Sequence, residues 1–175
     1  MNQAQTMNIV KIRRLMICLL VCAAALLMTG CYESDTPLDP APQIPADTRI
    51  LGIWRCATPD RGDAAFTLTI TRATEASYFV RRQEAGKDPE PFEGYASALN
   101  GALIINMHSL ADQQRAAHWN FVRYSLLQIN VMYVRVVHER LLKGVAPAEV
   151  RATVEREVDN PELYEDSFVC IRSDN

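Results

Sequence analysis

From residue 49 to the end of the chain, apolar and polar positions follow the two-residue period of short β-strands. Phe66-Thr67-Leu68-Thr69-Ile70-Thr71 is the clearest case, because its apolar side chains fall on one face and its threonines on the other. Short apolar runs predict further strands at 50–56, 78–82, 92–99, 102–107, 118–126, 129–137 and 168–172. Asn100-Gly101 predicts a tight hairpin turn, and Leu127-Gln128 is the predicted turn of a second hairpin.

The second hairpin has two apolar faces. With a two-residue turn, one predicted face carries Val122, Tyr124, Leu126, Ile129, Val131 and Tyr133, and the other carries Trp119, Phe121, Met132, Val134 and Val136. A helix is predicted at 147–158, since Pro147 suits a first helical position and Val150, Val154 and Val158 form a stripe. We expect one face of the hairpin to fill the interior and the valine stripe to cover the other.

The order of these elements predicts a mainly β fold. Consecutive hairpins with short connections are typical of an antiparallel meander, here of about eight strands with one helix before the last. We expect the meander to be a closed or nearly closed barrel that spans residues 49–175. A chain of this length is enough for one domain with a single core.

The first 30 residues have a different pattern. Lys11, Arg13 and Arg14 precede an apolar run at 15–28, which is the layout of a secretory signal and is short for a transmembrane helix. The run ends in Met28-Thr29-Gly30-Cys31, which resembles the lipobox of bacterial lipoprotein precursors, although that family prefers Leu, Val or Ile at the position of Met28. The resemblance implies cleavage before Cys31 and a diacylglycerol, with palmitate-like chains, on its sulfur. An ordinary secretory signal or an uncleaved anchor is the alternative.

The implied lipid anchor predicts where the protein is located. Two or three acyl chains hold a protein on a bilayer, at about 0.8 kcal/mol for each buried methylene. In lipoproteins an Asp after the acylated Cys is typical of the inner membrane, and this chain has Tyr32 instead. For a Gram-negative source the resemblance therefore implies the inner leaflet of the outer membrane, with the domain in the periplasm. Residues 31–48 are acidic and contain four prolines, so we expect a solvated tether.

Net charge and cysteine content limit the partners and the covalent links that the protein is expected to have. The leader holds three of the 18 basic residues and none of the 21 acidic ones, so its removal changes the net charge from −3 to −6. Nucleic acid is therefore an unfavourable partner. After the leader is removed and Cys31 is acylated, Cys56 and Cys170 remain, and we expect them to form a disulfide in an oxidising compartment. Two buried thiols are the alternative.

One short motif suggests a family of barrels. Gly52-Ile53-Trp54 resembles the G-x-W of lipocalins and related calycins. The resemblance implies a ligand-holding up-and-down barrel in which the Trp packs at the closed end against an Arg of the last strand, here Arg172. A simple core position for Trp54 is the alternative. The candidates for the cavity lining are Phe66, Leu68, Ile70, Tyr95, Tyr124 and Tyr133, and the tyrosines have ordinary core packing as their alternative.

The sequence contains no catalytic motif that would identify an enzyme. His118 and His138 fall on opposite faces of the second hairpin, so we predict no metal site and no cofactor. The acidic stretch 159–166 is interpreted as a solvated connection. The first hypothesis is a binding module that holds an apolar ligand or docks a protein of the envelope, such as an assembly factor, an inhibitor or an immunity protein. The alternative is an envelope-acting hydrolase whose carboxylates meet only in the folded chain.

Overall fold

The computed structural model describes residues 34–59, 66–111, 118–138 and 141–173. The chain divides after Gly30, and residues 31–175 form one compact unit. The predicted leader and Cys31 lie outside the described residues, so their interpretation stays a prediction. Within the described residues, no helix combines the length and the apolar character that crossing a membrane requires.

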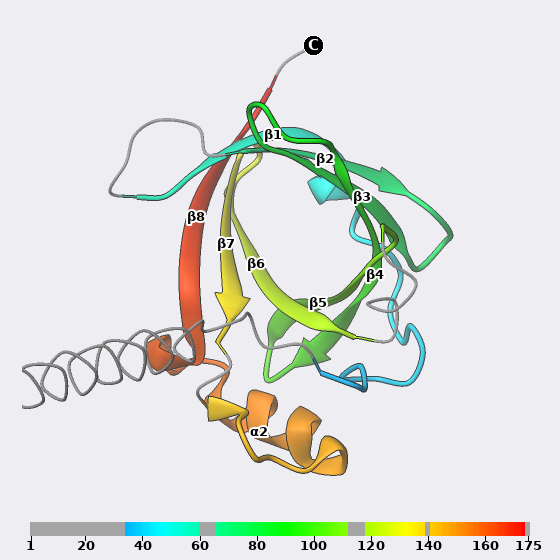
Figure 1. The fold of residues 1–175 in the computed structure, drawn as a ribbon, viewed down its shortest axis with the longest axis vertical. Helices are drawn as coiled ribbons and strands as arrows, with labels where there is room; N and C mark the ends of the chain where they lie inside the picture. Colours follow the sequence, from blue (N-terminus) through cyan, green and yellow to red (C-terminus); the bar gives the residue numbers. More distant parts are fainter. Residues whose placement is uncertain (1–33, 60–65, 112–117, 139–140, 174–175) are drawn as a thin grey trace, which may run out of the picture. The chain divides into compact units, whose positions relative to one another are not determined.

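Eight antiparallel strands form a closed barrel, and this confirms the predicted fold class (Figure 1). The strands are β1 (Gly52–Ala57), β2 (Phe66–Arg72), β3 (Tyr78–Gln83), β4 (Glu90–Leu99), β5 (Ala102–Ser109), β6 (Asn120–Gln128), β7 (Val131–Val137) and β8 (Tyr164–Arg172). Each strand pairs with the next one along the chain, and β8 closes the ring by pairing with β1. The sheet therefore has no open edge that would invite another strand.

The meander gives the barrel two different ends. The β2–β3, β4–β5 and β6–β7 turns lie together at one end, because every second connection of an antiparallel meander returns to the same side. The 3-10 helix η1 (Thr48–Ile50) enters β1 at this end, which we call the closed end. The β1–β2, β3–β4 and β5–β6 connections lie at the other end, which we call the open end. Asn100 and Gly101 form the β4–β5 turn, both with positive φ, as their sequence predicts.

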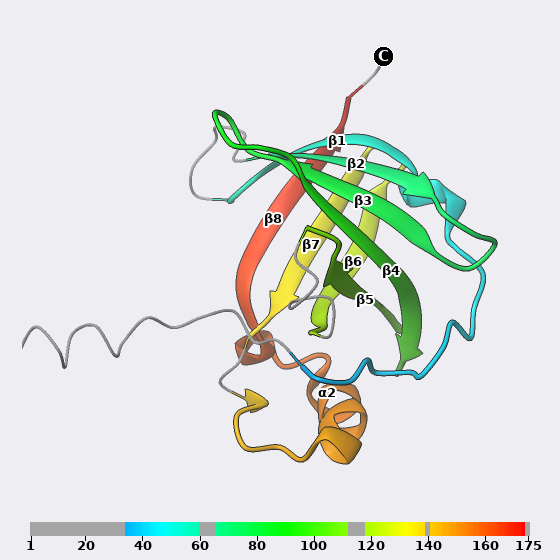
Figure 2. The ribbon, with the colours of Figure 1, turned by 45° about the vertical axis from the view of Figure 1, so that its right-hand side comes forward.

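A second apolar core lies outside the barrel wall. Between β7 and β8, the described residues form three helices: η4 (Pro147–Glu149), α2 (Val150–Glu157) and η5 (Pro161–Leu163). The valines at 150, 154 and 158 are buried and pack with Ile104 of β5 and Phe121 of β6. The predicted role of the valine stripe is therefore confirmed, and Figure 2 shows α2 outside the ring of strands.

The prediction that residues 31–48 form a solvated tether is wrong for its described part. Residues 34–47, which we call the N-terminal segment, run along the outer wall of the barrel. Leu38 is only 3% exposed and belongs to the same outer core as α2. Its backbone N–H donates to Oδ1 of the buried Asn106 in β5 at 2.7 Å. This part of the chain is therefore a component of the folded domain.

The physical reason lies in polar groups on the outer wall. The Tyr95 hydroxyl of β4 donates to the carbonyl of Asp39, and the Asp39 carboxylate accepts from Arg151 of α2 at 3.0 Å. Buried polar groups such as these need hydrogen-bond partners, and the N-terminal segment supplies them. The prolines restrict the segment to an extended path without preventing these contacts.

The predicted register of the β6–β7 hairpin is also wrong. Leu126 faces Met132 and Gln128 faces Val131, so Leu127 is the extra residue of a β-bulge and Ile129-Asn130 form the turn. The bulge keeps Leu126 on the interior face while it changes the pairing beyond the turn. Tyr124 consequently shares its face with Val134 and not with Tyr133.

Candidate functional site

The barrel contains an apolar cavity with a volume of about 220 Å³. Its wall is built from the inward-facing residues of seven strands, together with Ile50 of η1. The lining residues are Ile50, Phe66, Leu68, Ile70, Arg82, Phe92, Ile105, Met107, Asn120, Val122, Tyr124, Met132, Val134, Val136, Glu165, Asp166 and Phe168. Apolar side chains dominate this list and the polar ones are few, which is the usual composition of a site for a small apolar ligand.

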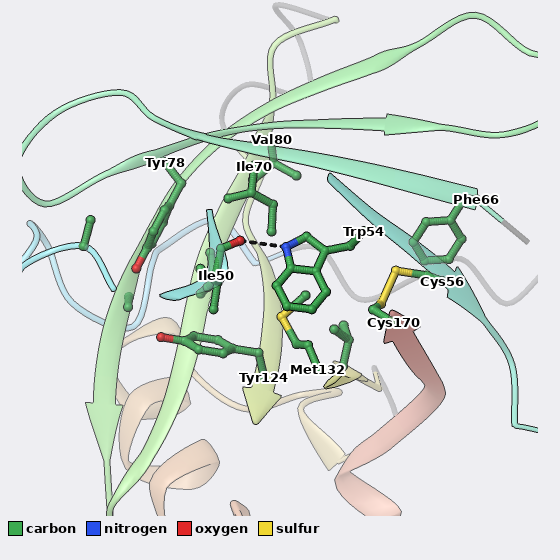
Figure 3. Close-up of a cluster of buried hydrophobic side chains, with 14 residues drawn as sticks. Ile50, Trp54, Cys56, Phe66, Ile70, Tyr78, Val80, Tyr124, Met132 and Cys170 are labelled. Carbon is green, nitrogen blue, oxygen red and sulfur yellow. Dashed lines mark hydrogen bonds between the residues drawn. A yellow bond between two sulfur atoms is a disulfide. The ribbon is translucent and has the colours of Figure 1, made fainter. Parts of the chain in front are cut away.

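The closed end is filled by aromatic packing around Trp54. Its indole N–H donates to the carbonyl of Ile50 at 2.8 Å, and both residues are fully buried (Figure 3). The Arg172 guanidinium lies 4.3 Å from the centre of the Trp54 ring and donates to the carbonyl of Leu51 at 2.5 Å. Arg172 also donates to the carbonyl of Arg49 in η1, so a side chain of the last strand holds the helix that covers this end of the barrel.

Gly52 has a steric reason to be glycine. Its φ is +126°, a conformation that other residues rarely adopt, and an added Cβ would lie 2.9 Å from a guanidinium nitrogen of Arg172. The structure thus brings Gly52, Trp54 and Arg172 together at the closed end, where the G-x-W resemblance implies them.

A polar cluster at the closed end ties the N-terminal segment to the barrel interior. The Asp47 N–H donates to the Tyr78 hydroxyl at 2.5 Å, and the Tyr124 hydroxyl donates to the Asp47 carboxylate at 3.3 Å. Hydrogen bonds from Arg49 keep the pKa of Asp47 below its usual value. Burial raises the pKa of Tyr78 and, more strongly, that of Tyr124. Both phenols therefore stay neutral and act as hydrogen-bond donors or acceptors.

The open end carries the charged groups of the cavity. Arg82 lies over the Phe66 ring at 5.0 Å and forms ion pairs with Glu84 and Glu90. Across the opening, Glu165 lies 3.8 Å from Nδ1 of His138, and Asp166 is exposed to solvent. The apolar interior is thus bordered by one cation and several carboxylates.

The candidate lining residues separate into two groups. Phe66, Leu68, Ile70 and Tyr124 line the cavity. Tyr95 lies on the outer wall, where its ring packs edge-to-face on Trp119 with centres 5.7 Å apart. Tyr133 alternates with the inward-facing Met132, so it faces outward as well. The prediction that Tyr95 and Tyr133 line the cavity is therefore wrong. Tyr95 faces the N-terminal segment on the outer wall, and the bulge at Leu127 turns Tyr133 outward.

Several lining residues were missed in the sequence. Met107 and Asn120 face each other across β5 and β6, and Phe168 meets Phe66 edge-to-face with ring centres 4.9 Å apart. The alternation of Ile105 and Met107 was a usable signal, because both fall on one face of a predicted strand. Ile50 had no such signal, since its inward position depends on a 3-10 helix that precedes the strand.

The predicted disulfide joins the strands at which the barrel closes. Cys56 of β1 and Cys170 of β8 are direct cross-strand partners with Cα atoms 4.0 Å apart, and both are fully buried. Figure 3 shows the bridge beside the Phe66 ring. A bond between the first and last strands requires that these strands be neighbours, so the disulfide and the closed barrel are consistent with each other.

No cluster of metal ligands is present among the described residues. This chain was compared with protein-family models, with curated proteins and with solved structures, and no family model, protein or structure matched it. The cavity and the sequence of the leader are therefore the features of this chain that bear on its function.

Proposed function

We propose that this protein is a lipid-anchored binding module of the bacterial envelope, facing the periplasm, that holds an apolar ligand inside its barrel. The observation that carries the proposal is the apolar cavity, which is filled at one end and bordered by polar groups at the other. The lipobox-like Met28-Thr29-Gly30-Cys31 supports the anchor, and the Tyr32 that follows supports the outer membrane.

Binding is tested by filling the cavity. Val122 lines the cavity and is only partly buried, so Val122→Phe places a ring in the free space. Val131 faces outward on β7, and Val131→Phe is the matched control. We expect Val122→Phe to weaken binding of the neutral dye N-phenylnaphthylamine by about tenfold or more, equivalent to about 1.4 kcal/mol, while the control binds as the parent does. Equal binding by all three proteins in a fluorescence titration would reject the cavity as the site.

The anchor has its own test. Cys31→Ser removes the sulfur that would carry the diacylglycerol, so we expect loss of incorporated radiolabelled palmitate and release of the protein from membranes. A variant that still incorporates the label to the parent level would show that Cys31 is not the acylated residue.

The hydrolase alternative is less well supported by the geometry. Such an enzyme needs one carboxyl group kept protonated by apolar surroundings, opposite a second, ionised one. In the cavity Asp166 is exposed, and its neighbour Glu165 faces His138. The two carboxylates also follow each other on one strand and do not flank a cleft.

Docking of an envelope protein is a second candidate, favoured by apolar side chains exposed at the closed end. Leu127 and Ile129 near the β6–β7 turn are 62% and 87% exposed, and Ile171 of β8 is 55% exposed. A photo-crosslinking residue at position 129 is expected to give one discrete adduct in intact cells if this patch docks a partner. The same residue at Asp88, on the β3–β4 connection, is the control. Identical patterns from both positions would remove this candidate.

A further inference from the structure

The described chain begins at the open end of the barrel. Ser34 forms an isolated antiparallel bridge with Trp119, through backbone hydrogen bonds of 2.8 and 2.7 Å. Trp119 directly precedes Asn120, the first residue of β6 and a lining residue of the cavity. The point at which the N-terminal segment attaches to the barrel is thus adjacent to the opening of the cavity.

Little chain separates this point from the proposed anchor. Ser34 follows Cys31 by three residues, which span at most about 10 Å when fully extended. The residues after Ser34 do not lengthen the connection to Cys31, because Asn106 and Tyr95 hold Leu38 and Asp39 on the barrel wall. Ser34 itself is only 3% exposed. A lipid on Cys31 would therefore keep the open end within about 10 Å of the bilayer surface, whereas a solvated tether would have left its orientation free.

We propose that the barrel stands with its cavity opening towards the bilayer and that the occupant of the cavity is one acyl chain of a bilayer phospholipid. This inference rests on the proposed function, because it requires both the lipid on Cys31 and the ligand-binding cavity.

The orientation of the barrel decides the route by which an apolar ligand reaches the cavity. An acyl chain that enters from the bilayer exchanges one apolar environment for another, so its methylenes are not exposed to water on the way. An opening that faced away from the membrane would require the whole chain to cross water first. A cavity of about 220 Å³ is below the usual 300–1,000 Å³ of drug-sized sites. The space therefore favours one chain over two, with the second chain left in the bilayer.

The border of the opening favours one kind of headgroup. Glu165 and Asp166 lie at the opening, and the only guanidinium among the lining residues, that of Arg82, is already paired with Glu84 and Glu90. An ammonium group is attracted to such a border and an anionic headgroup is repelled. Phosphatidylethanolamine is therefore expected to occupy the cavity in preference to phosphatidylglycerol.

The two tryptophans of the chain lie at opposite ends and serve as reporters. In Trp119→Phe the remaining Trp54 is fully buried at the closed end, and in Trp54→Phe the remaining Trp119 lies at the open end. The lipidated protein is placed in phosphatidylethanolamine–phosphatidylcholine vesicles whose ethanolamine lipid carries bromine, a short-range quencher of indole fluorescence, near the ends of its acyl chains. We expect Trp54 emission to be reduced, because Ile50 and Met132 of the cavity wall belong to the same buried cluster as Trp54, and Val122→Phe to restore it.

The orientation is measured with lipids brominated close to the headgroup, which we expect to quench Trp119. If Trp54→Phe does not fold, the difference in quenching between the parent and Trp119→Phe gives the same quantity. Unquenched Trp119 in the lipidated protein would overturn the orientation. Equal quenching of Trp54 in the unlipidated Cys31→Ser protein would also overturn it, because the anchor would then be unnecessary.

The remaining outcomes distinguish this inference from the proposed function. Unquenched Trp54 in a protein that still binds N-phenylnaphthylamine would reject the bilayer chain as occupant and leave the binding module intact. Loss of both signals would reject the binding module itself. Quenching of Trp54 only when brominated fatty acid is built into the anchor on Cys31 would show that the occupant is the protein's own acyl chain, and would overturn the phospholipid proposal. Stronger quenching by brominated phosphatidylglycerol would overturn the headgroup preference.

Discussion

The two ends of the barrel are built in different ways. At the closed end Ile50, Trp54 and Tyr78 are fully buried, and a guanidinium covers the indole. At the open end Phe92, Met107 and Asn120 line the cavity but are only partly buried. Close packing supplies most of the free energy of folding, whereas a ligand site needs apolar surface without a partner in the chain. The comparison teaches that stability and binding are carried by different ends of one barrel.

The largest expected effect comes from breaking the closed end. Trp54→Ala removes a fully buried indole, its hydrogen bond to Ile50 and the surface on which Arg172 packs, and we expect a loss of about 3–5 kcal/mol in the free energy of unfolding. Phe92→Ala at the open end is the control and should cost about 1 kcal/mol, because the ring is partly exposed already. Urea denaturation measures both, and similar losses at the two ends would contradict the comparison.

The second-largest effect on stability is expected at the barrel seam, by which we mean the pairing of β1 with β8. The double variant Cys56→Ala/Cys170→Ala removes a bridge across 114 residues of sequence, and we expect a loss of about 2–5 kcal/mol. Because β1 and β8 also pair through their backbones, the barrel should remain closed and the dye affinity should change little. A double variant that unfolds at the same urea concentration as the parent would show that strand pairing alone holds the seam.

The sequence was informative where a local pattern sets the structure. Period-two alternation predicted the strand that carries Phe66, Leu68 and Ile70. Asn100-Gly101 predicted the β4–β5 turn, because few other pairs adopt positive φ twice. The disulfide followed from the number of cysteines in an oxidising compartment. Each of these inferences needs only neighbouring residues or a count, so one sequence is sufficient.

The rest depended on contacts between distant segments. The prolines and acids at 34–47 have the composition of a linker, yet Asn106 and Tyr95, far away in sequence, supply the partners that hold this segment on the barrel. The bulge at Leu127 belongs to the pairing of β6 with β7, and this one-residue change places Tyr133 on the outside and not in the predicted cavity. The charged border of the opening likewise comes from strands that are widely separated in the chain.

The smallest expected effect comes from the polar cluster at the closed end. It tests whether the charge of Asp47 contributes to the free energy of unfolding. Hydrogen bonds from Arg49 lower the pKa of Asp47 below 3.8, so its ionised form stabilises the folded state above that pH. This stability is lost as the pH falls from 3.8 through the lower folded-state pKa. Asp47→Asn keeps an oxygen for the N–H of Arg49 but removes the charge, and should cost a few tenths to about 1 kcal/mol at neutral pH, as expected for a partly exposed ion pair.

The pH dependence distinguishes this charge effect from a general loss of packing. The difference in unfolding free energy between the parent and Asp47→Asn should be constant above pH 3.8 and shrink below it, because the parent then loses the same ionised group. Asp88→Asn, at an exposed position of the open end, is the control and should leave the unfolding free energy near that of the parent. Urea denaturation from neutral pH to below 3.8 measures all three proteins. A difference that stays constant through the acid range would mean that Asp47 acts only by its shape, and the closed end would then owe its stability to Trp54 and its aromatic neighbours alone.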